Sequence, residues 1–552
     1  MKFYASGLAF AAFTCFQPLS SAAQCDGLLA ATPAEKHEQF GYALALSGAT
    51  LAVGAPSHDG VAGGTGGVIV FDRSGAGWAQ AAVLIAPDGA QLDQLGFAVA
   101  LDGDVLVAGA PGDSEGTSIT DIGAAYVFER GPGGWVQAAK LTASDALSGP
   151  IIWAADLGWS VTVSGATAVV GAPGDSPTYP QVTLSESGSA YVFERTPTGW
   201  VETAKLFASD GDGAEQFGIG VSLDGDTLAV GAFHEKVGAD RTGAVYVFDR
   251  TPAGWVESTK LVPQGAADGD EFGQVLDLEG DTLLVAADNS DAAAEGGGAV
   301  YVYERTPGGW VESALLTAGD ATANDHFGRS VALSGNRALI GADNAGLDFA
   351  GAAYLFERTP SGWVELEAFP GPNGPGWDLF GSAVALDGSE ALVGERYGDS
   401  PALNGSGVVH LFGLGDGPCL SADAEAISVA AGGVQTFTLD ASQASPAGGD
   451  LYFVLGTAGP TDPPIPVDGH ALPLTPDGYF TFTVLSPNVP PFANTLGVLD
   501  GTGFATASLT VPPASSPSLI GVELHHAALI LPAVLGGAAL GASNAVPLAL
   551  QP

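Results

Sequence analysis

Short apolar runs separated by tight turns make up most of the chain, and they recur in a fixed order. In one typical stretch two apolar runs flank Asp224-Gly225-Asp226, and an Asp-Gly turn between such runs favours a β-hairpin. Gly243–Arg250 then has the β-branched and aromatic residues that strands prefer, and Gly254–Leu261 follows after a Thr-Pro-Ala-Gly turn. The stretch therefore predicts a four-stranded antiparallel meander.

The same unit occurs seven times. In each copy a Phe-Gly or Leu-Gly pair precedes a Gly-Ala-Pro-like triplet by fourteen residues, and the pairs begin at residues 40, 95, 157, 217, 272, 327 and 380. The internal offset is constant while the period varies from 53 to 62 residues, which indicates rigid hairpins joined by loops of different length. Radial packing buries the faces of such meanders and leaves only short edges, and a linear solenoid is the alternative. We expect an all-β chain with a seven-bladed β-propeller of four-stranded antiparallel blades.

The two ends of the repeat array favour the closed ring. The seventh unit stops after its third strand at Val408–Phe412, and no Trp strand follows it. Leu28–Gly41 aligns with Leu206–Gly218, which is a segment that follows a Trp strand. We therefore expect the N-terminal segment to supply the fourth strand of the last blade.

Residues 1–23 have the features of a secretory signal peptide. Lys2 precedes an apolar stretch, Gly7–Phe16, and small residues precede a predicted cleavage site after Ala23. We therefore expect a secreted or cell-surface protein. We expect no membrane span later in the chain, since the apolar segment Ala527–Leu540 has only 14 residues and is interrupted by Pro and Gly.

Removal of the signal peptide would leave two cysteines, Cys25 and Cys419. One pair in an exported chain suggests one disulfide, and a bond between these positions would lock the ring. The propeller is expected over residues 24–418. Beyond it the composition changes, and several short strands separated by Asp-Gly turns predict a small β-sandwich over 419–552.

Charge and composition exclude several classes of protein. Acidic residues outnumber Lys and Arg by 61 to 16, which gives a formal charge of −45. Such a surface repels phosphates, so we expect no nucleic-acid partner and no binding to an anionic membrane. With 81 Gly and 36 Pro the chain is not a helical bundle, because both residues interrupt helices.

The Phe-Gly and Gly-Ala-Pro elements, as in Phe40-Gly41 with Gly54-Ala55-Pro56, resemble FG-GAP repeats. These repeats build the seven-bladed propeller at the head of integrin α chains, and the resemblance covers about residues 25–417. In integrins several blades carry a calcium loop between the two elements. Here a tight Asp-Gly or Ser-Gly hairpin fills that interval, so the family's calcium residues do not carry over to it.

Acidic loops elsewhere in the unit are candidate calcium sites. Asp- and Gly-containing loops precede most of the Phe-Gly pairs, and Ca²⁺ takes about six to eight oxygen ligands. The candidate ligands are Asp210, Asp212, Asp268, Asp270, Asp320 and Asp325. The alternative is that these residues serve turn geometry on a solvated acidic surface. Calcium is the one cofactor that the sequence suggests.

Two further sets of residues repeat with the units. Because repetition is what packing between equivalent blades requires, we expect the Trp set to pack between blades and the Arg set to form structural pairs. The Trp set is Trp78, Trp135, Trp200, Trp255, Trp310 and Trp363. The Arg set, in which each member follows Asp or Glu, is Arg73, Arg130, Arg195, Arg250, Arg305 and Arg358.

The sequence favours a non-catalytic protein, because its eight His residues form no HExxH pattern and it contains neither G-x-S-x-G nor a P-loop motif. Two long loops break the repeat, Gly174–Ser187 with Tyr179 and Gly371–Asp378 with Trp377. Long loops on a rigid scaffold often carry a ligand surface, so we expect them at the recognition rim; the alternative is that they are insertions with no ligand.

These features predict a secreted binding or adhesion protein that uses the propeller as a recognition scaffold, with calcium as its candidate stabilising ion. The expected partner is an extracellular protein or polysaccharide. Two alternatives stay open: an extracellular polysaccharide-active enzyme with a site in the propeller channel, and a structural component of the cell envelope.

Overall fold

The computed structural model contains a propeller and a C-terminal unit. It describes residues 26–414 except 36, 62, 75–76, 115–121, 146–154, 177, 180–181, 184–185, 239, 347–348, 373–377, 389, 401–402 and 404, and it describes strands between residues 419 and 551. The chain divides into two compact units, of which one is Cys25–Leu414 and the other includes Gly415–Pro552. The predicted signal peptide lies outside the described residues.

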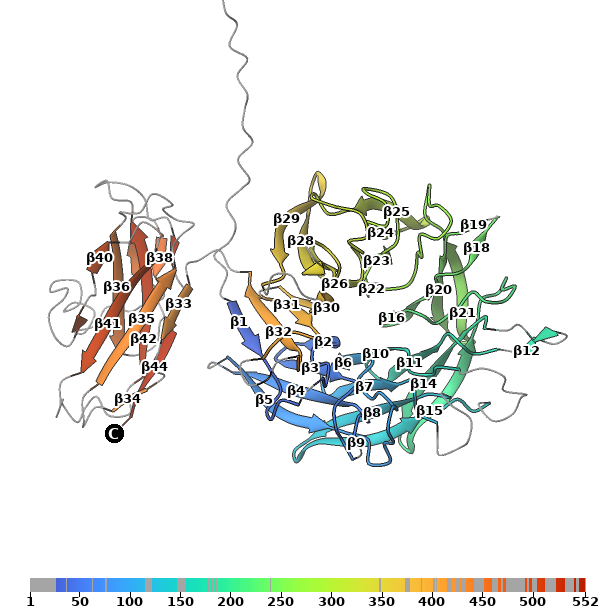
Figure 1. Cartoon of the computed structure of the whole chain (residues 1–552), viewed down its shortest axis with the longest axis horizontal. Helices are drawn as coiled ribbons and strands as arrows, with labels where there is room; N and C mark the ends of the chain where they lie inside the picture. Colours follow the sequence, from blue (N-terminus) through green and yellow to red (C-terminus); the bar gives the residue numbers. More distant parts are fainter. Residues whose placement is uncertain are drawn as a thin grey trace, which may run out of the picture. The chain divides into compact units, whose positions relative to one another are not determined.

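Seven four-stranded antiparallel sheets form the propeller, numbered here as blades 1 to 7 in chain order. The first strand of each blade lies towards the centre of the ring and the fourth towards its outside (Figure 1). Their strands, from blade 1 to blade 7, are β2 (Ala43–Ser47), β3 (Thr50–Ala55), β4 (Gly67–Ser74), β5 (Gly77–Leu84); β6 (Val99–Asp102), β7 (Val105–Ala110), β8 (Ala124–Gly131), β9 (Gly134–Leu141); β10 (Ser160–Ser164), β11 (Thr167–Ala172), β14 (Ser189–Thr196), β15 (Gly199–Leu206); β16 (Val221–Asp224), β17 (Thr227–Ala232), β20 (Ala244–Thr251), β21 (Gly254–Leu261); β22 (Leu276–Glu279), β23 (Thr282–Ala287), β24 (Ala299–Thr306), β25 (Gly309–Leu316); β26 (Ser330–Ser334), β27 (Arg337–Ala342), β28 (Ala352–Thr359), β29 (Gly362–Pro370); β30 (Phe380–Asp387), β31 (Glu390–Glu395), β32 (Val408–Gly413) and β1 (Asp26–Leu29).

The last blade is completed by the N-terminal strand, as the sequence predicted. Its sheet order is β1-β32-β31-β30, and β1 pairs antiparallel with β32, with Leu28 opposite His410. The ring is therefore closed by hydrogen bonds between the two ends of the repeat array. Cys25 lies outside the described residues, so the disulfide with Cys419 stays a prediction.

The FG pair and the GAP triplet meet where neighbouring blades touch. Gly109 of the blade 2 triplet lies against the backbone oxygen of Gly158, which belongs to the blade 3 pair, and a Cβ at position 109 would be only 1.9 Å from that oxygen. The same approach, at 1.8–2.2 Å, recurs at Gly54, Gly171, Gly231, Gly341 and Gly394. Gly158 also has a φ of +96°, and its N–H donates to the carbonyl of Gly171 at 3.0 Å. Both halves of the motif therefore require glycine.

Blade 5 is the exception, because Ala286 occupies the triplet position there. A Cβ at Gly328 of the next blade would lie 3.2 Å from the Ala286 side chain, so the two backbones are farther apart at this junction.

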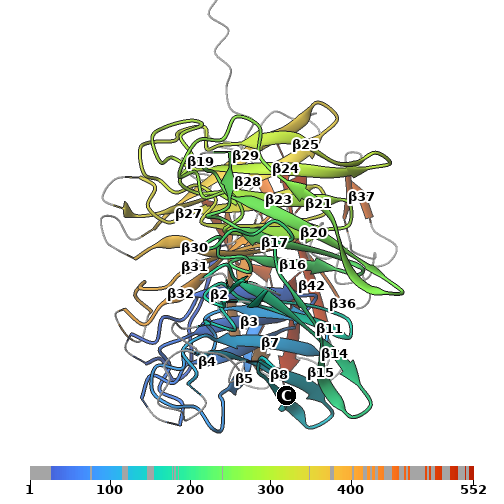
Figure 2. The same ribbon diagram turned by 90° about the vertical axis from the view of Figure 1, so that its right-hand side faces the viewer.

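Buried apolar residues of neighbouring blades form shared clusters, and seven such clusters follow one another around the ring. In the cluster between blades 1 and 2, Val70 packs with Leu106 and Tyr126, and strands β3 and β7 of these blades lie one above the other in Figure 2. Each Trp of the repeated set packs partly buried against one cluster, which confirms the packing role.

The repeated Arg residues pair with carboxylates of the preceding blade. Arg250 lies 2.8 Å from Glu194, and Arg73 lies 3.2 Å from Asp387, which connects blade 1 to blade 7. The other pairs are Arg130 with Asp72, Arg195 with Glu129, Arg305 with Asp249 and Arg358 with Glu304. The structural pairing is confirmed, although each partly exposed pair contributes only about 0–1 kcal/mol.

The C-terminal unit is also all-β. Its two larger sheets have the orders β33-β35-β41-β39 and β34-β44-β42-β36-β40, with β43 beside β42, and β37 and β38 form a separate two-stranded sheet. Two larger sheets are what a sandwich needs. The described part of the chain contains no helix with the length and hydropathy to cross a bilayer. The strands are β33 (Cys419–Ala422), β34 (Ala426–Ser428), β35 (Gly433–Asp440), β36 (Leu451–Ala458), β37 (Ile465–Val467), β38 (His470–Leu472), β39 (Phe492–Ala493), β40 (Leu496–Val498), β41 (Phe504–Val511), β42 (Glu523–Leu531), β43 (Gly541–Ala542) and β44 (Val546–Gln551).

We expect Gly171→Ala to lower the free energy of unfolding by about 1–3 kcal/mol, because the methyl group would overlap the Gly218 oxygen and push blades 3 and 4 apart. Ala286→Gly is the matched control at the same position of blade 5, where we expect a loss of only about 0.5–1 kcal/mol. Urea-induced unfolding measures both. Equal losses in the two variants would contradict the explanation by close contact.

Candidate ligand-binding surface on the propeller

The predicted calcium ligands lie in the three loops that lead into blades 4, 5 and 6. Asp210 and Asp212 lie between β15 and β16, and the other four lie in the corresponding loops of the next two blades: Asp268 and Asp270 after β21, and Asp320 and Asp325 after β25. The structure therefore brings them together in pairs within a loop and not into one shared cluster.

Asp210 and Asp320 accept hydrogen bonds from tyrosine hydroxyls. Tyr246 donates to Asp210 at 2.7 Å, and Tyr354 donates to Asp320 at 2.9 Å. Burial and the adjacent carboxylate raise the pKa of each tyrosine well above its usual value, so both hydroxyls stay protonated donors. Each pair anchors an interblade loop to the third strand of the following blade.

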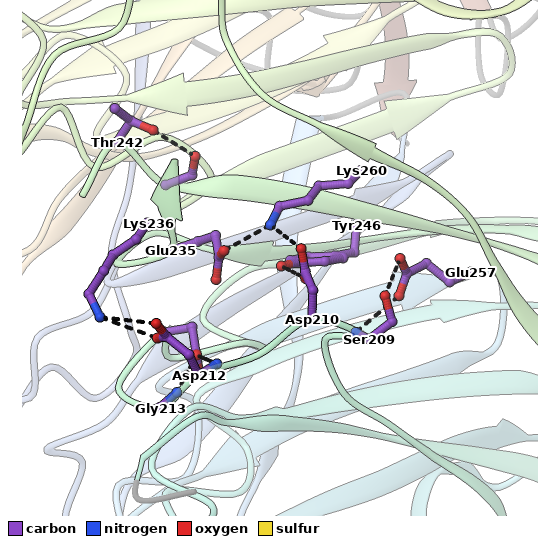
Figure 3. Close-up of polar contacts among 12 residues, drawn as sticks. Ser209, Asp210, Asp212, Gly213, Glu235, Lys236, Thr242, Tyr246, Glu257 and Lys260 are labelled. Carbon is purple, nitrogen blue, oxygen red and sulfur yellow. Dashed lines mark hydrogen bonds and ion pairs between the residues drawn. The ribbon is translucent and has the colours of Figure 1, made fainter. Parts of the chain in front are cut away.

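In blades 2 to 4 a lysine adds a second connection to this anchor. Lys260 lies 2.7 Å from Asp210 and 2.8 Å from Glu235, which is on the β17–β20 loop (Figure 3). Burial raises the pKa of Asp210, but Lys260 and Tyr246 outweigh it and hold that pKa below its usual value. The equivalent lysines contact two carboxylates each: Lys140 with Asp88 and Asp113, and Lys205 with Asp145 and Asp175.

The other predicted ligands hold their own loops in shape. Asp270 and Asp325 accept backbone N–H groups from three residues earlier, at 2.8 Å and 2.6 Å. Asp268 accepts the N–H of Arg241 at 2.8 Å, and Asp212 pairs with Lys236 at 3.2 Å. These contacts support the turn-geometry alternative. Calcium binding stays a prediction, which thermal unfolding with and without millimolar Ca²⁺ would test.

Among the described residues one group of three potential metal ligands, Glu35, Glu38 and His58, has its ligand atoms within 4.8 Å of one another. Nδ1 of His58 lies 3.0 Å from Glu35 and 3.1 Å from the buried Glu38. The hydrogen bond to Glu38 raises the pKa of His58. These contacts are those of an ion pair that connects the segment after β1 to blade 1.

Two positions in each unit vary between blades while the residues around them repeat. They are the residue after the FG pair and the third residue of the triplet, and together they are called the axial rim here. After the pairs stand Tyr42, Phe97, Trp159, Ile219, Gln274, Arg329 and Ser382; at the ends of the triplets stand Pro56, Pro111, Pro173, Phe233, Asp288, Asp343 and Arg396. Blades 1 to 4 thus contribute aromatic and apolar residues, and blades 5 to 7 contribute polar and charged ones.

On the aromatic side these residues form a continuous strip. The ring of Trp159 lies 4.8 Å from that of Phe97, which lies 5.0 Å from that of Tyr42. The guanidinium of Arg396 lies 5.2 Å from the Tyr42 ring and 5.6 Å from the Tyr397 ring. These five residues, called the aromatic strip, come from blades 3, 2, 1 and 7, so the strip crosses the junction where the ring closes.

A cavity of about 290 Å³ lies beside the Trp159 end of the strip, between blades 3 and 4. It is lined by Asp156, Trp159, Pro173, Gly174, Glu186, Gln216 and Ile219. Trp159 is 38% exposed, which is unusual for so large an apolar side chain. The cavity therefore combines an exposed indole with two carboxylates and an amide.

On the polar side, in blades 5 and 6, one arginine pairs with two carboxylates. Arg329 lies 3.7 Å from Asp288 and 3.5 Å from Asp343, and both carboxylates are buried. Burial raises the pKa of Asp288, although Arg329 opposes this. The Gln274 amide also reaches Asp288 at 2.8 Å when its nitrogen faces that carboxylate. Blades 5 and 6 therefore have an internally satisfied polar cluster.

Part of this surface coincides with a loop that the sequence pattern indicated. Gly174 and Glu186, near the two ends of the predicted rim loop, line the cavity. Between them the loop forms a hairpin of β12 (Thr178–Tyr179) and β13 (Val182–Thr183). In Figure 1 β12 projects from the ring. Tyr179 thus lies on this hairpin, whereas Trp377 lies outside the described residues. The sequence pattern did not single out Trp159. The available signal is its place directly after the Leu157-Gly158 pair, whereas each Trp of the repeated set follows the glycine that begins an outer strand.

We expect Lys260→Met to lower the free energy of unfolding by about 1–2 kcal/mol, because it leaves the buried Glu235 beside Asp210 without a cation. The loss should shrink at acidic pH, where the carboxylates become protonated. Lys236→Met, which removes only the exposed pair with Asp212, should change stability by about 0.5 kcal/mol or less. Chemical denaturation near neutral and acidic pH tests this, and equal effects of the two variants would count against it.

The raised pKa of His58 predicts a pH dependence of stability. The protonated ring contributes fully below its unfolded pKa of about 6.5, and the contribution is lost as pH rises through the higher folded value. The melting temperature of wild type should therefore exceed that of His58→Gln by more at about pH 6 than at about pH 9. A difference that is independent of pH would show that the ion pair does not stabilise the fold.

The comparisons with known proteins agree with this architecture. FG-GAP repeats match at residues 78–128, 135–193, 200–248, 255–303 and 310–356. No curated protein sequence gives a significant match. Among solved structures the chain is similar to one titled "Crystal Structure of Mitotic Checkpoint Complex", with 11% identity, a TM-score of 0.43 and coverage of 73% of this chain and 98% of that one; a likeness at this level carries no argument about function. With five matched repeats in a closed ring of seven blades, the protein is an FG-GAP repeat protein with an integrin α-like β-propeller.

Proposed function

We propose that the protein is an extracellular, non-catalytic recognition protein that binds its ligand at the axial rim. The observation that carries the proposal is the aromatic strip, in which exposed and half-buried rings from several blades lie in contact at the positions where the repeat varies. Residues that repeat in every blade are needed for packing between blades. The axial rim residues vary from blade to blade, so packing does not determine them and they are available for ligand binding.

The physical character of the strip suits binding. Aromatic side chains present a large contact area with few rotatable bonds, and Trp, Tyr and Arg are the residues most often found at binding hot spots. Tyr42, Phe97 and Trp159 directly follow the FG glycines of the close interblade contacts, so their backbone position is fixed by these contacts. A ligand would therefore meet a preorganised surface, which lowers the entropy cost of binding.

Other features support the extracellular role. FG-GAP repeats are typical of extracellular proteins, and an acidic surface of this charge keeps a secreted protein soluble. Adhesion to an extracellular protein or polysaccharide is the form of recognition that we favour.

Binding of the purified protein to panels of extracellular polysaccharides and matrix proteins tests the proposal. We expect Trp159→Ala and Tyr397→Ala to weaken binding by about 10-fold or more, as hot-spot truncations do. Val136→Ala and Val311→Ala are the controls, since these side chains are exposed on the outer strands β9 and β25. Loss of binding in the control variants alone would place the ligand surface on the outer strands. Release of reducing ends from a polysaccharide would show an enzyme instead.

A further inference from the structure

Arg396 is chemically unlike the rest of the axial rim. It stands in blade 7 where blades 1 to 3 have the proline of the triplet. Its guanidinium lies over the rings of Tyr42 and Tyr397, and its buried Nε has no hydrogen-bond partner among the described residues. Contact with two aromatic rings restricts the orientation of the guanidinium.

The contrast with the other arginines is informative. Arg329, the second arginine of the rim, lies between Asp288 and Asp343. The six repeated hairpin arginines all have a carboxylate in the neighbouring blade. Within the described residues Arg396 forms no such pair, although the chain has 61 acidic residues and only 16 basic ones. Its guanidinium therefore lies beside aromatic rings and, among the described residues, is not paired with a carboxylate.

We propose that Arg396 binds a carboxylate of the ligand, and that this ligand is a mainly neutral glycan containing a uronic acid residue. This proposal rests on the proposed function of the axial rim. A planar guanidinium binds carboxylates through two parallel hydrogen bonds, which a preoriented arginine makes at low entropy cost. The sugar that carries the carboxylate would lie at Arg396, and its neighbours in the chain would stack on Tyr42, Phe97 and Trp159.

The far end of the strip favours a glycan over a peptide. The cavity beside Trp159 is lined by the side chains of Asp156, Glu186 and Gln216, which provide several hydrogen-bond acceptors next to an apolar ring. A sugar ring matches this combination, because its hydroxyl groups donate hydrogen bonds while its C–H face packs on the indole. A volume of about 290 Å³ suits a single small group at the end of a longer ligand.

The net charge restricts how acidic that glycan is. A chain with a formal charge of −45 repels a dense polyanion over roughly a Debye length of 10 Å, and one arginine cannot offset that repulsion. Isolated uronates separated by neutral sugars satisfy both Arg396 and the acidic surroundings.

The test compares glucuronoxylan and xanthan with their carboxyl-reduced forms, in which the uronate has become a neutral sugar. By isothermal titration calorimetry we expect wild type to bind at least one native polysaccharide about 10-fold or more tightly than its reduced form. Arg396→Gln should lose this preference while keeping its affinity for the reduced form, and Arg396→Lys should retain part of it. Arg241→Gln is the control, because this exposed arginine has the same charge and lies on the β18–β19 hairpin, Lys236–Val237 and Asp240–Arg241.

Several outcomes would overturn the proposal. These are equal binding of native and reduced polysaccharide, an unchanged preference in Arg396→Gln, binding of neither polysaccharide, and binding only of an aspartate-containing peptide. The proposed function fails separately, since it requires that Trp159→Ala and Tyr397→Ala weaken binding of whichever ligand is found. Melting temperatures of all variants show whether a loss of binding reflects a loss of folding.

Discussion

The contact between glycine backbones of neighbouring blades is the constraint on which the propeller depends. In six of the seven blades the first glycine of the triplet faces the carbonyl oxygen of the next FG glycine, with no room for a side chain. The contact fixes how closely two blades approach, and the apolar clusters between blades fill the space that this approach leaves. At the last junction Gly394 meets Gly41, so the same contact also joins the two ends of the array.

Acidic side chains hold the loops that connect one blade to the next. Glu202 on β15 accepts the N–H of Ser144 at 2.8 Å, and Glu365 on β29 accepts the N–H of Gly319 at 2.8 Å. Glu257 does the same for Ser209 (Figure 3). Many carboxylates therefore accept hydrogen bonds from backbone N–H groups in the loops, and a carboxylate is a strong acceptor.

The fold could be predicted from the sequence because the repeated motifs have a constant spacing. The constant offset between pair and triplet, the interrupted seventh unit and the early Leu28–Gly41 segment were enough to predict the ring and its closing strand, which the pairing of β1 with β32 confirms. The packing of the Trp set and the pairing of the Arg set followed from repetition alone. The same reasoning could not decide what the acidic loops do, since a carboxylate that accepts an N–H and one that binds calcium have the same sequence pattern.

The aromatic strip could not be predicted from the sequence, and the reason is physical. Trp159, Phe97 and Tyr42 are about sixty residues apart along the chain and become neighbours only because equivalent positions converge around the axis. A repeat is recognised by its constant positions, whereas this surface consists of positions that vary between the blades. The decay of the triplet in the later repeats was visible in the sequence, but its meaning depends on Arg396 lying over Tyr42 of the first blade.

The closing strand has a consequence for biosynthesis. β1 is the first strand of the propeller to be made, yet its partner β32 is nearly four hundred residues later, at Val408–Gly413. During synthesis β1 therefore has no partner until β32 has been made, and such a long-range pairing is slow to form. Its length of only four residues, Asp26–Leu29, limits the risk that the waiting segment associates with another nascent copy.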